Sequence, residues 1–232
     1  MSALLQLRNV NSFYGDAHIL HNVSLEINPG EVVSLLGRNG VGKTTTLKTI
    51  MGMVKVDGDV SFNNENINGV SVNKVAKKGI GYVPEERRIF PSLTVKENLL
   101  VGVYEKGNWG LDEIYELFPV LEKRQDSMGT MLSGGEQQML AIARCLMTNP
   151  KLVLLDEPCE GLAPVIVQEL ERAISKLKDK QVTILVAEQS LRLSKTLSNR
   201  HYILSKGEVC FEGNSDELFS NEDVLVRYLG VS

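Results

Sequence analysis

The chain is poor in cysteine, and the three residues it has, Cys145, Cys159 and Cys210, are widely spaced and form no CxxC pair. An odd, scattered set argues against a disulfide framework or a zinc site and favours reduced thiols in a cytosol. The N-terminal segment MSALLQLRNV also lacks a basic start followed by an apolar stretch of about 7–15 residues, so we expect no secretory signal.

Long apolar runs and an excess of positive charge are missing as well. Runs such as LVLL and VTILVA are far too short to span a bilayer, so we expect a soluble protein. The formal net charge of -4 gives no electrostatic reason to expect nucleic acid as a partner. At 232 residues, with 43% hydrophobic and 23% charged residues, the composition is that of an ordinary globular chain with a sizeable core.

Continuous apolar runs alternate along the chain with patterns of helical spacing. EVVSLL, KLVLLDEP and VTILVAEQ each have the composition of a strand buried on both faces. Helices are predicted over about 43–53 and 164–178, and the segment from about 92 to 147 is mostly helical by its spacing. This alternation predicts a parallel sheet covered by helices, which is an α/β fold. Further elements are expected as short strands at 4–10 and 22–28, a turn–strand–turn at 57–69, a hairpin in HYILSKGEVCFEG and a short C-terminal helix.

The segment GRNGVGKT, residues 37–44, matches the phosphate-loop pattern GxxxxGK[ST] at every fixed position. Its glycines let the backbone curl so that successive N–H groups point inward at an anion, and the helix that follows adds its positive end. Lys43 supplies a cation for the β- and γ-phosphates of a nucleotide, and the Thr44 hydroxyl suits Mg²⁺. The alternative is a flexible glycine turn with a chance lysine, which the strand before it and the helix after it disfavour. The predicted nucleotide contacts are Gly37, Arg38, Asn39, Gly40, Val41, Gly42, Lys43, Thr44 and Thr45.

Asp156 and Glu157 end the run LVLLDE, at the carboxyl end of a predicted buried strand, where open α/β sheets bind ligands. Adjacent strand residues point to opposite faces, but the twist at a strand's end can bring both toward one ligand. Asp156 suits the ligand shell of Mg²⁺, and Glu157 suits a general base that activates a water aimed at the γ-phosphate. The alternative, two acids that begin a loop ahead of Pro158, loses weight beside a phosphate loop.

The stretch MLSGGEQQMLAIAR, residues 131–144, predicts a helix whose start carries two adjacent glycines. Ser133 and Glu136 match a capping box, which accounts for those two residues. It does not account for Gly134 and Gly135, because glycine in the first turn of a helix costs stability relative to alanine. Glycines at such a place allow another group to approach the backbone closely, so we expect a second phosphate-contacting surface here.

LSGGEQQ resembles the signature motif of ABC-type ATPases, and GRNGVGKT and LVLLDE occupy the places of that family's two Walker motifs. The resemblance covers essentially the whole chain. It implies a head-to-tail dimer in which the signature motif of one subunit contacts the ATP held by the phosphate loop of the other. It also implies that Tyr14, in FYGD, stacks on adenine; without the family, an edge-strand aromatic is the favoured interpretation. The contacts implied to the other subunit's ATP are Ser133, Gly134, Gly135 and Gln137.

Three positions depart from the common pattern of that family. Glu85, in GYVPEERRIFPSLTVKENLL, stands where glutamine is usual, and Gln189, in ILVAEQS, stands where histidine is usual. Ala163, in PCEGLAP, stands where aspartate is usual. Together the three resemble the ATP-binding subunits of branched-chain amino-acid importers, although Cys159-Glu160 is unusual within that group.

Two of these departures change the expected chemistry. The amide of Gln189 can only form hydrogen bonds, so we expect it to act as a sensor that orients the γ-phosphate or the attacking water. Glu85 would place a third carboxylate near Mg²⁺ and favour metal retention over water positioning. Lys74, Lys77 and Lys78, at helical spacing, and the nearby Arg87-Arg88 are expected on a solvated helix face. Docking to acidic loops of a membrane partner or to lipid headgroups is the alternative.

The resemblance implies one ABC-type ATP-binding domain over residues 1–232, with a P-loop NTPase core, an antiparallel β subdomain and an α-helical subdomain over about 88–147. With ATP and Mg²⁺ as cofactors, we expect the chain to hydrolyse ATP and to power a membrane importer, for branched-chain amino acids. The expected partners are separate transmembrane permease subunits, a second ATP-binding subunit (identical or homologous) and, indirectly, a solute-binding protein. These partners would hold the chain in the cytoplasm, at the inner face of the cell membrane.

Three other functions stay open at this point. One is the ATPase of an importer for another small polar solute, such as urea or another amino acid. Another is a soluble ABC ATPase of DNA repair or chromosome organisation, which is disfavoured because the stretch from Lys43 to Asp156 leaves no room for a long coiled-coil insertion. The last is a regulator that binds ATP without turnover; Glu157 argues against it, since a positioned base contributes ~10²–10⁴-fold in rate.

Overall fold

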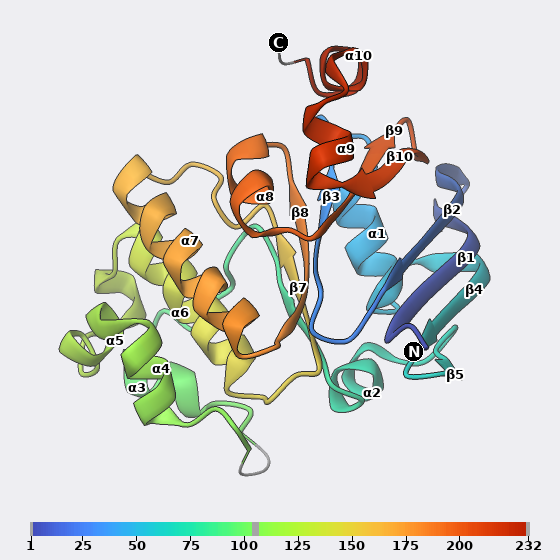
Figure 1. Cartoon of the computed structure of the whole chain (residues 1–232). Coiled ribbons are helices and arrows are strands. Elements are labelled where there is room, and N and C mark those ends of the chain that lie inside the picture. Colours follow the sequence, from blue (N-terminus) through green and yellow to red (C-terminus); the bar gives the residue numbers. More distant parts are fainter. Residues whose placement is uncertain (1, 104–106, 231–232) are drawn as a thin grey trace.

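The computed structural model describes residues 2–103 and 107–230, which form two β-sheets with helices packed between and beside them (Figure 1). The strands of the larger sheet are β3 (Val32–Leu36), β6 (Ile80–Val83), β7 (Leu152–Asp156), β8 (Thr183–Glu188), β9 (Arg200–Ser205) and β10 (Glu208–Asn214). Their order is β10-β9-β3-β8-β7-β6, and every neighbouring pair is parallel except β9 with β10. The predicted α/β fold is confirmed, as are the buried strands β3, β7 and β8, whose residues are all buried.

The smaller sheet is antiparallel and has the order β2-β1-β4-β5. Its strands are β1 (Leu5–Tyr14), β2 (Ala17–Ile27), β4 (Lys55–Phe62) and β5 (Glu65–Asn66). The hairpin β1–β2 runs well beyond the expected strands at 4–10 and 22–28, because its polar outer half keeps pairing as far as Tyr14 opposite Ala17. Asn11 helps to hold this half: its Oδ1 accepts the backbone N–H of Asn22 at 3.1 Å.

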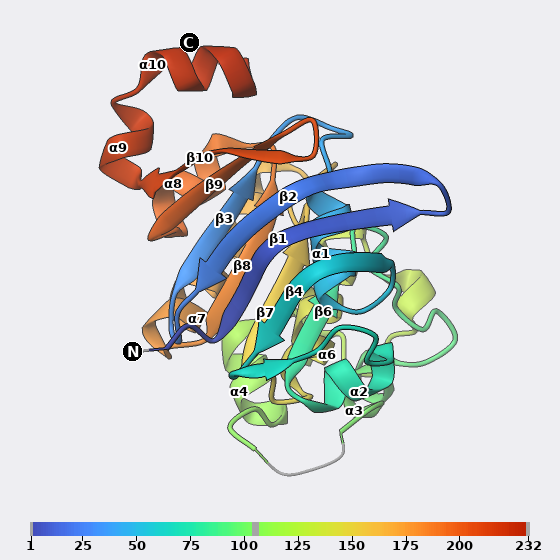
Figure 2. The same ribbon diagram turned by 90° about the vertical axis from the view of Figure 1, so that its right-hand side faces the viewer.

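Helices cover both faces of the larger sheet. On one face α1 (Lys43–Ile50) lies between the two sheets, and on the other lie α6 (Gly134–Leu146), α7 (Pro164–Asp179) and α8 (Leu191–Leu197) (Figure 2). The sheet therefore separates two hydrophobic clusters. Alternate residues of β7 enter one or the other, since Val153 packs with α6 and α7 whereas Leu152 packs on the side of α1.

The segment predicted to be mostly helical contains short helices around the long α6. They are α3 (Val95–Leu100), α4 (Leu111–Leu117), α5 (Pro119–Lys123) and the 3₁₀ turn η1 (Gly129–Met131). The capping box expected at the start of α6 is present: the Glu136 N–H donates to Ser133 Oγ at 3.3 Å, and Glu136 Oε2 accepts the Ser133 N–H at 2.7 Å. The remaining elements are α2 (Val72–Lys77), α9 (Ser215–Phe219), α10 (Glu222–Val224) and η2 (Leu225–Leu229).

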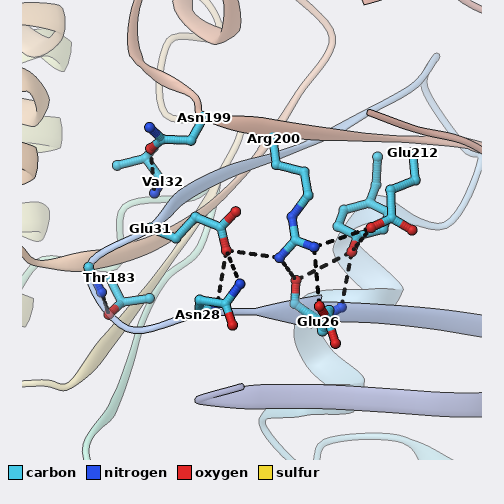
Figure 3. Close-up of polar contacts among 10 residues, drawn as sticks. Glu26, Asn28, Glu31, Val32, Thr183, Asn199, Arg200 and Glu212 are labelled. Carbon is cyan, nitrogen blue, oxygen red and sulfur yellow. Dashed lines mark hydrogen bonds and ion pairs between the residues drawn. The ribbon is translucent and has the colours of Figure 1, made fainter. Parts of the chain in front are cut away.

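Arg200, at the start of β9, joins the two sheets (Figure 3). Its Nη2 donates to Glu31 Oε2 at 2.9 Å and to the carbonyl of Glu26, at the end of β2, at 2.8 Å. Its Nη1 lies 3.2 Å from Glu212 Oε1 on β10. The Arg200 guanidinium thus links the two sheets to each other and to the loop before β3. The phosphate loop follows directly after β3. None of the helices within residues 2–103 and 107–230 combines the length and the apolar composition that a membrane span requires.

Candidate active site

The glycine-rich loop connects β3 to α1 and is confined by the strands around it. A Cβ on Gly37 would lie 2.5 Å from the carbonyl oxygen of Leu204, and one on Gly42 would lie 2.7 Å from Leu20 Cδ2. Gly42 also has φ 113, a conformation open to few residues other than glycine. Only glycine fits both positions, which explains the spacing of the motif in terms of backbone conformation and packing.

Lys43 folds back over this loop. Its Nζ donates to the carbonyl oxygens of Gly37 at 2.8 Å and Arg38 at 3.0 Å, and lies 3.1 Å from Glu157 Oε1. The side chain is 3% exposed. Of the other loop residues, Arg38, Asn39 and Gly40 are exposed, Val41 and Thr44 are partly buried, and Thr45 is buried.

Asp156, the last residue of β7, accepts two hydroxyl groups. Thr44 Oγ1 donates to its Oδ1 at 2.9 Å, and the Tyr82 hydroxyl, on the neighbouring strand β6, donates to its Oδ2 at 2.9 Å. Burial raises the pKa of Asp156, while these two hydrogen bonds oppose the rise. Burial, and then the charge of Asp156, raises the pKa of Tyr82, so that its hydroxyl remains a donor. Sequence reasoning missed Tyr82; the available signal was its place in GYVP, just before Glu85.

Glu157 leaves the strand conformation. Its φ is 44, while its N–H still donates to the carbonyl of Ala187 on β8 at 2.9 Å. The left-handed backbone turns its carboxylate toward Lys43 instead of continuing the alternation of β7. This is how two adjacent acids reach one site. Burial would raise the pKa of Glu157, but hydrogen bonds from Glu160 and Lys43 outweigh burial and lower it, so the carboxylate is ionised and can accept a proton.

Glu160 is a second residue whose role the sequence did not reveal, although its presence next to Cys159 was unusual. The hydrogen bond that it shares with Glu157, and then the charge of Glu157, raise the pKa of Glu160 to about 7. Cys159 packs close by: its N–H donates to Glu188 Oε1 at 3.3 Å, and Glu188 is almost fully buried. The loop after β7 is therefore anchored to the end of β8 beside the two carboxyl groups.

The structure brings together only part of the predicted site. Lys43 contacts Glu157, and Thr44 contacts Asp156, as described above. Glu85 is exposed just beyond β6, and its charge contributes to raising the pKa of Asp156, which places it within electrostatic reach. Gln189 is exposed directly after β8, and Tyr14, 43% exposed, ends β1; within the described residues neither has a side-chain hydrogen bond to the phosphate loop.

Ser133, Gly134, Gly135 and Gln137 lie at the start of α6, and their side-chain hydrogen bonds in the described structure stay within the segment 129–137. The two glycines have internal reasons to lack a side chain. A Cβ on Gly134 would lie 2.8 Å from Nη1 of Arg87, and one on Gly135 would lie 2.6 Å from Cγ2 of Ile166. Packing therefore requires glycine at 135, whereas a side chain at 134 would displace only the flexible end of Arg87. Contact with a nucleotide of another subunit stays a prediction.

The arrangement suits a nucleoside triphosphate. A loop of backbone N–H groups, a buried lysine and a neighbouring ionised carboxylate provide a phosphate cradle, a counter-charge and a proton acceptor. The Thr44 hydroxyl and the Asp156 carboxylate, 2.9 Å apart, are oxygen donors of the kind that Mg²⁺ takes together with phosphates and water. No group of three or more His, Cys, Asp or Glu side chains among the described residues could hold a metal by itself.

Comparison with known proteins agrees with this geometry. The model of the ABC transporter family matches residues 20–160, more than half of the chain. The chain therefore belongs to the ABC transporter family, as a subunit that binds and hydrolyses ATP. Two of its relatives belong to different transport systems.

One relative is the high-affinity branched-chain amino acid transport ATP-binding protein BraG of Pseudomonas aeruginosa, 40% identical over 98% of this chain and 100% of BraG. Another is the lipopolysaccharide export system ATP-binding protein LptB of Escherichia coli, 36% identical over 98% of each chain. Among solved structures, the dimeric post-hydrolysis state of the ATP-binding cassette MJ0796, bound to ADP and Pi, superimposes with a TM-score of 0.80 at 28% identity, over 91% of this chain and 98% of that one.

Proposed function

We propose that this chain is the ATP-hydrolysing subunit of an importer for branched-chain amino acids. Two observations support the substrate: the 40% identity to BraG over the whole chain, and the combination of Glu85, Ala163 and Gln189. The relation to LptB, at 36%, makes an exporter the second candidate. The contact of Lys43 and Thr44 with the two acids at the end of β7 supports the chemistry in either case.

In the proposed reaction, Lys43 moves its charge from Glu157 to the β- and γ-phosphates when ATP occupies the loop. Glu157 then accepts a proton from the attacking water as the water oxygen bonds to the γ-phosphorus. The bond to the β,γ-bridging oxygen breaks, its electron pair stays on ADP, and phosphate is released. Gln189 orients the water or the γ-phosphate by hydrogen bonding.

Thr44 and Asp156 would hold Mg²⁺, with Glu85 as a third oxygen donor near it. When bound, this ion neutralises charge on the phosphates. Tyr82 holds Asp156 through its other carboxylate oxygen, which fixes the orientation of the acid. Tyr14 would stack its exposed ring on adenine, at the end of the hairpin β1–β2.

Two such subunits would act head to tail. Ser133, Gly134, Gly135 and Gln137 of one would contact the ATP held by the other, and the dimeric state of MJ0796 supports an arrangement of this kind. Residues of about 88–147 would form the helical subdomain. Several large apolar side chains of this region are exposed, and we propose that they contact the transmembrane permease subunits, which would hold the chain at the inner face of the membrane with a solute-binding protein as an indirect partner. They are Phe90, Leu100, Val101, Val103, Met128 and Met131.

Uptake by cells that carry the chain tests the substrate. Cells producing Lys43→Ala should lose uptake of labelled leucine, isoleucine and valine, whereas Lys48→Ala, on the same helix, should retain it. Loss of urea uptake alone would replace the proposed substrate by another small solute. Unchanged uptake of all of these, with loss of a lipid-linked surface component, would favour the exporter.

A further inference from the structure

The guanidinium of Arg87 lies against the first turn of α6, where Gly134 and Gly135 have no side chains. Its Nη1 lies 2.8 Å from the position that a Cβ on Gly134 would take, with Cζ at 3.6 Å. Gly134 follows Ser133 directly, so the positive charge sits beside residues proposed to contact a nucleotide across the dimer. An alanine at 134 would push the guanidinium away.

The loop that carries Arg87 is held firmly. Arg87 and Arg88 have φ 64 and 45, so two consecutive non-glycine residues adopt the left-handed conformation, which is strained for residues other than glycine. Such a backbone persists only where its surroundings determine it. Here the Arg87 N–H donates to the carbonyl of Pro84 at 3.0 Å, and the Arg88 N–H donates to that of Glu86 at 2.6 Å.

Two side chains from the helical segment fasten the same loop. Arg144, on α6, donates from Nη2 to the carbonyl of Arg88 at 2.6 Å and lies over the Phe90 ring, 4.8 Å from its centroid. Asn98, fully buried on α3, accepts the Phe90 N–H at 2.8 Å and donates to the Phe90 carbonyl at 2.9 Å. Arg87 is therefore presented by a fixed backbone, and α6 itself supplies part of the fixation.

The charge of Arg87 is not paired within the part of the chain that the structure describes. In the described ranges its side chain has no ion pair and no hydrogen bond, whereas Arg88 pairs with Glu86 at 3.5 Å and Arg124 pairs with Glu136 at 3.4 Å. A guanidinium is the side chain best suited to phosphate, because its planar set of donors matches phosphate oxygens. A fixed guanidinium without an acidic partner, next to Ser133, has the chemistry of a phosphate contact.

We propose that Arg87 contacts the phosphates of the ATP held by a second copy of this chain, beside Ser133 and Gly135. The proposal rests on the head-to-tail pairing of the proposed function and adds a residue to it. It also gives Gly134 a role: its missing Cβ leaves the space in which the guanidinium lies. Loss of a charge-assisted hydrogen bond of this type should weaken the ATP-dependent dimer by about tenfold or more.

The test measures dimerisation by light scattering of the full chain in a Glu157→Gln background, with ATP and Mg²⁺, over a range of protein concentrations. Arg87→Ala should raise the dissociation constant of the dimer about tenfold or more, and Arg87→Lys should restore part of the loss. Arg88→Ala is the matched control, because it removes a neighbouring arginine with the same backbone conformation and should leave the constant unchanged. ATP binding to the monomer, followed by calorimetry, should be equal in all of these variants.

Each outcome decides between the possible roles. Equal dimerisation of Arg87→Ala and its parent overturns the assignment of Arg87 and leaves the proposed function standing. Weaker ATP binding by the Arg87→Ala monomer, together with a lower unfolding temperature, assigns Arg87 a packing role instead. If Glu157→Gln binds ATP but does not dimerise, the pairing of like chains falls together with the role of Arg87. If it binds no ATP, the proposed function itself is overturned.

Discussion

Lys43 Nζ and Glu157 Oε1 lie 3.1 Å apart, with side chains only 3% and 11% exposed. The lysine of the phosphate loop and the proposed general base therefore neutralise each other in a protected place. A γ-phosphate entering the loop would compete with Glu157 for this cation. ATP binding would then release the carboxylate that hydrolysis needs.

Removing one member of this pair should cost more stability than removing both. We expect Lys43→Met to lower the free energy of unfolding by about 3 kcal/mol, because Glu157 is left buried without a counter-charge. The double variant Lys43→Met/Glu157→Gln should recover part of the loss, with a coupling of about 0.5–3 kcal/mol. Urea unfolding of the four proteins measures this coupling; strictly additive changes would mean that the pair contributes nothing.

The Tyr82 hydroxyl should matter for Mg²⁺ more than for folding. Tyr82→Phe leaves Asp156 Oδ2 without its donor, and we expect the Mg²⁺ concentration for half-maximal ATP hydrolysis to rise about tenfold. Tyr115→Phe is a suitable control, because that hydroxyl is buried and has no hydrogen-bond partner in the described structure. Equal Mg²⁺ dependence of both variants would rule out a positioning role for Tyr82.

Glu85 is expected to increase the retention of Mg²⁺. Its charge contributes to raising the pKa of Asp156, so Glu85→Gln should lower that pKa slightly and yet weaken Mg²⁺ binding, because one oxygen ligand loses its charge. The same hydrolysis assay, compared with Glu86→Gln at the next exposed position, measures the effect. An unchanged Mg²⁺ dependence in Glu85→Gln would refute the assignment.

Gly135 should tolerate alanine only if Ile166 is made smaller. The added Cβ would lie 2.6 Å from Ile166 Cγ2, so Gly135→Ala should destabilise the chain by about 1–3 kcal/mol through overpacking between α6 and α7. Combining it with Ile166→Ala should cost less than the sum of the two single changes. Thermal unfolding of the three variants tests this, and a strictly additive double variant would show that α6 shifts instead of clashing.

His201 should make folding stability depend on acid. It is fully buried between Ser34 Oγ at 2.6 Å and Ser215 Oγ at 2.9 Å, and burial lowers its pKa to about 4. In the unfolded chain this histidine has a pKa of about 6.5. Between pH 4 and 6.5 the unfolded chain therefore binds a proton at His201, whereas the folded chain does not. The contribution is thus complete above about pH 6.5 and is lost as the pH falls toward 4, and the loss amounts to roughly 2 kcal/mol at pH 5.

Unfolding in urea at pH 7.5 and pH 5 measures this contribution. His201→Gln, which cannot be protonated, should lose less stability between the two pH values than the parent does. An identical loss in both proteins would assign the acid sensitivity to other groups.

The parts of the molecule predicted well from sequence are those fixed by neighbouring residues. The strand before Gly37 and the helix from Lys43 follow from a local pattern, and so do the capping box at Ser133 and the hairpin around Lys206-Gly207. Each of these elements depends on apolar periodicity or on a backbone conformation that only certain residues adopt.

The parts that could not be predicted depend on pairing between distant segments. Tyr82 reaches Asp156 because β6 and β7 are adjacent, although the two residues are 74 positions apart in the sequence. Arg87 packs beside Gly134, and Ile166 packs beside Gly135, because the fold brings together segments that are distant in the sequence. The two glycines are unusual at the start of a helix, but the sequence alone does not predict which side chains pack beside them.

The register of β7 on β8 has a consequence for how this chain can change in length. Asp156 is opposite Ala187, and the next residue, Glu157, donates its N–H to the same Ala187 carbonyl. Inserting one residue before Leu155 would put Leu155 in the place of Asp156, and each side chain of β7 after the insertion would face the opposite hydrophobic cluster. An insertion at the exposed turn Asn63-Asn64 would lengthen a connection far from the two acids, at the cost of at most the contacts of this turn with Ser2 and Leu4. We therefore expect insertions to be tolerated at exposed turns and not within β7, where they would displace the two acids.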